Sequence, residues 1–85
     1  MSRYEIVLRH WAPGAGFSHS ETIDWLDDAE TAEDYIKSVD VPIEPYWRGG
    51  DTEVRIYEHI GGADGPTVLY DRAMVSEVIK SEKMV

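Results

Sequence analysis

The chain has 85 residues, of which 42% are hydrophobic and 11% aromatic. This composition suits one small folded domain over residues 1–85 and excludes a disordered chain. Seventeen acidic residues against eight Lys and Arg give a formal net charge of −9, which argues against direct binding of nucleic acid. Because the chain has no cysteine, disulfides, thiolate nucleophiles and cysteine-ligated zinc are excluded.

The distribution of apolar residues bears on where the protein works. No apolar stretch of the signal-peptide kind follows the first Met, and no run approaches the roughly 20 apolar residues of a membrane helix. We therefore expect a cytoplasmic protein with no membrane partner. A domain of this size buries only about 60–65% of its unfolded surface, so a homodimer would gain stability and is a further expectation.

The first quarter of the chain predicts a hairpin. Residues Arg3 to His10 alternate apolar and polar side chains, which indicates a strand with Tyr4, Ile6 and Leu8 on one side. Pro and Gly between residues 11 and 16 predict a turn. A second strand is predicted from about Ser18 to Trp25, and its parity places three apolar side chains on one face: Phe17, Ile23 and Trp25.

An amphipathic helix is predicted next. Five apolar residues recur at helical spacing, namely Ala29, Ala32, Tyr35, Ile36 and Val39. Asp27 is the predicted N-cap, with Glu30 three residues later completing a capping box. Acidic residues in the first turn also suit the positive end of the helix dipole.

The remaining chain predicts two more strands and a short helix. Strands are expected at Glu53 to Ile60 and Pro66 to Tyr70, joined by a glycine-rich hairpin, and a helix at about Arg72 to Ser81. The first of these strands places Val54, Ile56 and Ile60 on one side. The predicted fold is α+β, a four-stranded antiparallel sheet of order ββαββ with one amphipathic helix on one face and a short C-terminal helix.

The negative charge is concentrated in one part of the sequence. Between Trp11 and Trp47 there are nine acidic residues and one Lys, a net charge of −8, whereas eight acidic and seven basic residues in the rest of the chain give −1. We interpret the exposed carboxylates as a surface that binds a basic site on a partner protein. That site could be one that normally binds DNA or RNA, because carboxylates and phosphates both offer anionic oxygens to Arg and Lys. The predicted carboxylates are Asp24, Asp27, Asp28, Glu33 and Asp34. The alternative is a solvated helix face that keeps the protein soluble.

A loop and a sheet face are two further candidate contacts. Tyr46, Trp47 and Arg48 are consecutive and belong to the residue types enriched at binding hot spots. The alternative is that Trp47 covers a sheet edge. The face of the sheet away from the helix is predicted to carry Val7, Arg9, Arg55, Tyr57, His59 and Leu69, a mixture that suits a dimer or partner interface.

The histidines offer a metal-binding alternative. If the first two strands pair, His10 and His19 face each other, with Glu21 on the same side as His19. Two imidazoles and a carboxylate suit zinc, nickel or copper. Facing histidines also occur as plain surface pairs, and no cofactor is predicted in the main interpretation.

The sequence thus favours a small acidic, non-enzymatic protein-interaction module. No motif identifies a family, but in its size, acidity and lack of cysteine the chain is similar in general character to phage and mobile-element accessory proteins, including anti-restriction and anti-CRISPR inhibitors. The alternatives are a metal-binding protein or enzyme that uses His10, His19 and Glu21, and a structural subunit of a homo-oligomer.

Overall fold

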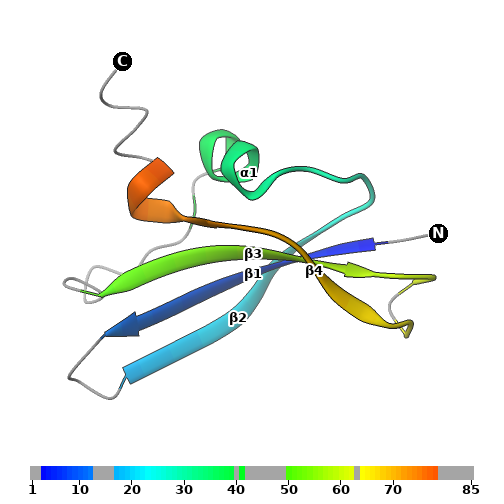
Figure 1. Ribbon diagram of the computed structural model, residues 1–85, viewed down its shortest axis with the longest axis horizontal. Coiled ribbons are helices and arrows are strands. Elements are labelled where there is room, and N and C mark those ends of the chain that lie inside the picture. The colour runs from blue at the N-terminus through cyan, green and yellow to red at the C-terminus, as the bar shows by residue number, and fades with distance from the viewer. Residues whose placement is uncertain (1–2, 13–16, 40, 42–49, 63, 79–85) are drawn as a thin grey trace.

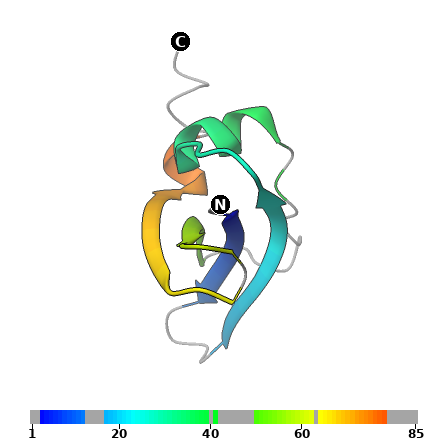
Figure 2. The same ribbon diagram turned by 90° about the vertical axis from the view of Figure 1, so that its right-hand side faces the viewer.

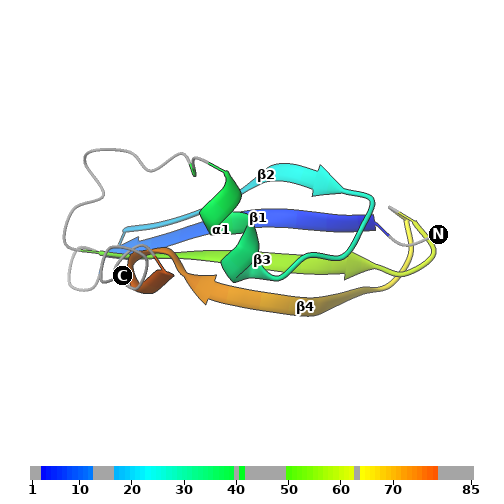
Figure 3. The ribbon, with the colours of Figure 1, turned by 90° about the horizontal axis from the view of Figure 1, so that it is seen from above.

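A four-stranded antiparallel sheet with a helix across one face makes up the computed structural model, which describes residues 3–12, 17–39, 41, 50–62 and 64–78. The strands are β1 (Arg3–Ala12), β2 (Phe17–Leu26), β3 (Asp51–His59) and β4 (Thr67–Met74), in the sheet order β2-β1-β3-β4. Helix α1 (Ala32–Ser38) lies over the sheet (Figure 1, and from above in Figure 3). With a further helical turn at residues 75–78, this confirms the predicted α+β class and element order.

The hydrophobic core lies between the sheet and α1; Figure 2 shows from one end how the helix lies over the strands. The central strands contribute Ile6, Leu8, Val54 and Ile56, which are fully buried. Their alternation with polar neighbours is the period of two that predicted these strands. The helical elements cover them with Ala32, Tyr35, Ile36, Val75 and Val78. Each large side chain so buried contributes roughly 1.5–3 kcal/mol.

The helix begins four residues later than the predicted capping box requires. Thr31 is the N-cap, and its hydroxyl accepts a hydrogen bond of 3.1 Å from the backbone N–H of Asp34. The N–H of Ala32 donates to Asp71 Oδ2 of β4 at 2.7 Å, so tertiary structure fixes this start. Asp27 is therefore not the cap, and Ala29, predicted on the buried face, is exposed.

A bulge in β2 changes the predicted parity of that strand. Ile6 pairs with Asp24 and Val7 with Thr22, so Ile23 has no direct partner on β1. An extra residue of this kind moves the following side chain to the opposite face. Ile23 packs against the core, whereas the ring of Trp25 lies 4.9 Å from that of His59, on the face away from α1. The prediction that these two residues share a face was wrong.

The predicted hairpin between β3 and β4 is present. Gly61 and Gly62 have φ values of 81° and 118°, which glycine adopts without steric cost. Strand β4 runs further than predicted, to Met74, and the helical turn begins only at residue 75. Within the described chain, no helix has the length and apolar character needed to cross a membrane.

Candidate functional site

The predicted carboxylates lie along one path that runs from one end of the sheet back over its middle. Residues 24–34, here called the acidic segment, leave β2, cross above the sheet and enter α1 (Figure 3). Its acidic side chains are Asp24, Asp27, Asp28, Glu30, Glu33 and Asp34, all of them exposed except the partly buried Glu30. The predicted acidic residues therefore belong to one continuous stretch of surface chain.

Two of these carboxylates have clear structural partners. The Asp24 carboxylate accepts two hydrogen bonds, one of 2.8 Å from the backbone N–H of Trp25 and one of 3.2 Å from the Tyr35 hydroxyl. Burial, followed by the charge of Asp24, raises the pKa of Tyr35 to about 12, so the phenol remains a donor at neutral pH. Glu33 pairs with Lys37 at 2.9 Å, one helical turn away. Asp24 and Glu33 thus help to fasten α1 to β2 and to support the helix itself.

The other carboxylates are left at the surface. The Asp27 side chain is 91% exposed, and its contact with Arg3 is long, at 3.8 Å. Within the part of the chain that the structure describes, the carboxylates of Asp28 and Asp34 form no hydrogen bond or ion pair. Since Thr31 caps the helix, Asp27 and Asp28 are not needed for that role. Both residues are exposed and therefore accessible to a partner.

The predicted histidine pair is present in the sheet. His10 lies directly opposite His19 in the β1–β2 register. His10 is buried, with Nδ1 2.9 Å from Thr52 Oγ1, and His19 Nε2 lies 3.4 Å from Glu21 Oε1. Among the described residues, no group of three or more His, Asp or Glu side chains is arranged to hold a metal ion. The Tyr46, Trp47 and Arg48 loop lies outside the described residues.

The sheet face away from α1, here called the open face, carries the residues that its predicted parity placed there. In the register of β1, β3 and β4, Val7 pairs with Arg55, Arg55 with Arg72, and Tyr57 with Leu69. Arg9 pairs with Glu53, two residues along from Arg55 on the same face. Basic, aromatic and apolar side chains are therefore mixed over the three strands.

One residue that sequence reasoning missed organises this face. The Glu53 side chain is only 4% exposed and is surrounded by three guanidinium groups, here called the arginine cluster: Arg9, Arg55 and Arg72. Their nitrogens lie 3.5, 2.5 and 3.4 Å from the Glu53 carboxylate oxygens, in that order. The signal in the sequence was the shared parity of Glu53 and Arg55 on one strand, but pairing with Arg9 and Arg72 depends on register.

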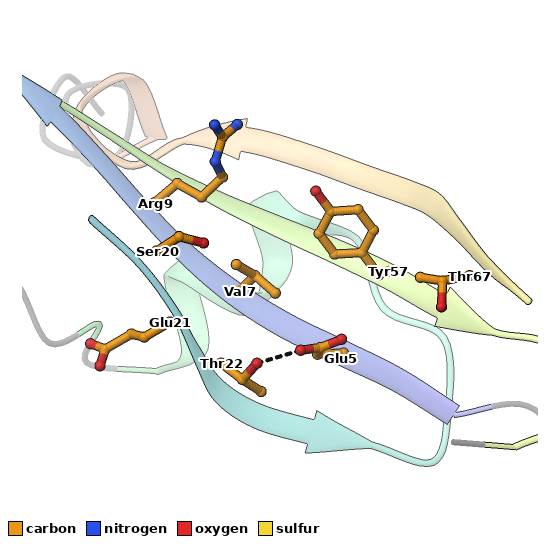
Figure 4. Close-up of a pocket in the computed structure, with 8 residues that line it drawn as sticks. All are labelled: Glu5, Val7, Arg9, Ser20, Glu21, Thr22, Tyr57 and Thr67. Carbon is orange, nitrogen blue, oxygen red and sulfur yellow. Dashed lines mark hydrogen bonds between the residues drawn. The ribbon is translucent and has the colours of Figure 1, made fainter. Parts of the chain in front are cut away.

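A second polar group lies further along the open face. Glu5 accepts a hydrogen bond from the Thr22 hydroxyl and contacts His59 Nε2 at 2.8 Å, while His59 Nδ1 lies 3.4 Å from Thr67 Oγ1. The Thr22 hydrogen bond, followed by that of His59, lowers the pKa of Glu5. Between Glu5 and Arg9 the face has a shallow hollow of about 390 Å³, with Tyr57 along its side (Figure 4).

Comparison with other proteins does not add to this geometry. The chain matches no family model, no curated protein and no solved structure. The molecule has two contrasting surfaces, the acidic segment and the open face with its arginine cluster.

Proposed function

We propose that the protein is a non-enzymatic interaction module whose acidic segment binds a basic surface of a partner protein. The observation that carries this is the position of the helix cap. Because Thr31 caps α1, the exposed carboxylates of Asp27 and Asp28 have no role in starting the helix. Charged groups that the fold does not use are available to steer an encounter and to pair with Arg or Lys.

The chemistry of the segment indicates the class of partner. Carboxylates, like phosphates, offer anionic oxygens to the donors of guanidinium and ammonium groups. A partner site that otherwise holds a nucleic acid has this character, so a protein of that kind is the class we propose. The same carboxylates repel nucleic acid itself.

The proposal is tested by charge reversal with a matched control. One variant changes Asp27, Asp28, Glu33 and Asp34 to Lys, and a control changes four exposed acidic residues outside the segment to Lys: Glu21, Asp51, Asp64 and Glu77. Both variants have the same net charge. The probe is a short oligo-arginine peptide, and its Kd is measured by calorimetry at physiological ionic strength.

We expect the segment variant to bind the peptide at least about tenfold more weakly than the control does, because four exposed ion pairs are each worth up to about 1 kcal/mol. In the wild-type protein, the peptide should shift the backbone NMR signals of residues 24–34 first. Equal losses in the two variants would show that only net charge matters and would overturn the proposal.

A further inference from the structure

The arginine cluster has the character of an anion-binding site, and it brings like charges close together in the sheet. Arg55 and Arg72 are direct cross-strand partners, and like charges in that position repel each other. Glu53 offsets this repulsion, but one carboxylate faces three guanidinium groups. A local excess of positive charge remains at this part of the open face, although the whole chain is acidic.

The cluster also has donors to spare. A guanidinium group carries five N–H donors in a planar fork that matches a carboxylate. Arg55 donates to Glu53 and to the Tyr57 hydroxyl, which holds it in place. The side chains of Arg9 and Arg72 are 37% and 62% exposed, so they can present further donors to a carboxylate that arrives from outside.

Asp27 and Asp28 of the same chain cannot supply that carboxylate, and Glu33, which lines a hollow with Arg72, is already paired with Lys37. Asp27 lies beside Arg3 at the start of β1, and Arg9 lies six residues further along the strand. At about 3.3 Å per residue this separation is roughly 20 Å. Asp27 and Asp28 can therefore reach the arginine cluster only from a second molecule.

We propose that the arginine cluster is the docking site for the acidic segment of a second copy of this chain. Asp27 and Asp28 of one copy pair with Arg9 and Arg72 of the next, so the contact is head-to-tail. A heterologous contact of this kind leaves one free surface at each end and continues into rings or filaments. This inference rests on the proposed function, since it names the basic surface that the acidic segment binds.

The experiment measures the weight-average mass of the purified chain by sedimentation equilibrium from micromolar to millimolar concentration. One variant, R9Q/R72Q, removes the two exposed guanidinium groups and leaves Arg55 paired with the buried Glu53. The other, D27K/D28K, reverses two exposed carboxylates. A control, D64K/E77K, makes the same charge change at exposed residues outside the proposed pairs. Glu77 lines a hollow with Arg72, so its change to Lys adds positive charge beside the cluster and does not weaken the docking of a carboxylate. Far-UV circular dichroism and thermal melting confirm that each variant folds.

The weight-average mass of the wild type and of the control should rise with concentration beyond twice the mass of one chain, which is 9.7 kDa. Each of the two surface variants alone should keep the mass of one chain. An equal mixture of R9Q/R72Q and D27K/D28K should reach two chains and stop, because one intact segment meets one intact cluster and no further contact remains.

A wild type that stays monomeric overturns the inference, as does a mixture that fails to associate although the wild type does. If the wild type is monomeric and the oligo-arginine peptide still requires residues 24–34, this inference fails while the proposed function stands. If R9Q/R72Q does not fold, unchanged association of D27K/D28K relative to D64K/E77K overturns the inference by itself.

Discussion

Glu53 is the residue on which the arrangement of the open face depends. Its carboxylate is almost fully covered and is the common partner of three arginines. Removing one charge from a buried ionic group is costly because the remaining charges lose their compensation. In this cluster the cost is moderated by water, since Arg9 and Arg72 are partly exposed.

The first prediction concerns this charge. Glu53→Gln keeps the size of the side chain but leaves three guanidinium groups without an anion, and we expect the free energy of unfolding to fall by about 2 kcal/mol. Urea denaturation at neutral pH measures it. The control is Glu58→Gln, which removes a partly buried acid from the same strand and should cost less than about 0.5 kcal/mol. Equal costs for the two variants would contradict a special role for Glu53.

The second prediction concerns Glu5 and acid stability. The hydrogen bonds from Thr22 and then His59 lower the pKa of Glu5 in the folded state. Its contribution to stability is therefore present above the unfolded pKa of about 4.3 and is lost as pH falls through the lower folded pKa. Glu5→Gln should be less stable than wild type by about 1 kcal/mol near pH 6, and the difference should shrink below about pH 4. A difference that grows on acidification would have the wrong sign. Urea denaturation over this pH range provides the measurement.

At the scale of the elements, the start of α1 shows how local signals compete. Asp27 with Glu30 and Thr31 with Asp34 both fit a capping pattern of an acceptor followed by an acid three residues later. Burial of Ala32 and its bond to Asp71 select the second. This choice depends on a strand 39 residues away, which local pattern does not contain.

The third prediction tests that choice of cap. Thr31→Ala removes the side-chain acceptor at the helix start and should lower the free energy of unfolding by about 1 kcal/mol. Asp27→Ala should change it by less than about 0.5 kcal/mol, as at an ordinary exposed site. Thermal or urea unfolding of the two single variants compares them directly. The opposite ranking would return the capping role to Asp27.

The strands were more predictable than their contacts. Alternation in β1 and β3 identified the buried Ile6, Leu8, Val54 and Ile56, because a strand buried on one face must alternate. The bulge at Ile23 was not predictable, since one extra residue changes parity without a sequence signal of its own. The same holds for the arginine cluster, which needs the register of three strands before Glu53 is seen to lie among its partners.

At the scale of the whole molecule, the net charge of −9 hides a separation of charge. Acidic residues follow the loop from β2 to α1, and the arginines gather on the open face. Composition and sequence position predicted the first, because the acids are contiguous in the chain. They predicted only part of the second: strand parity placed Arg9 and Arg55 on the open face, whereas Arg72 and Glu53 join them only through the register of the folded sheet.

The last prediction separates the role of the acidic segment in binding from any role in folding. Asp27→Asn with Asp28→Asn removes two carboxylates that the helix cap does not use, from a chain that already repels itself. Less self-repulsion should leave the free energy of unfolding unchanged or raise it by up to about 0.5 kcal/mol. The same variant should bind the oligo-arginine peptide several-fold more weakly, because two of the accessible anionic groups are gone. Substitution of a binding residue often raises stability while it weakens function. Urea denaturation and calorimetry on one protein sample provide the free energy of unfolding and the Kd for the peptide. A variant that lost both stability and binding would instead show that Asp27 and Asp28 stabilise the fold.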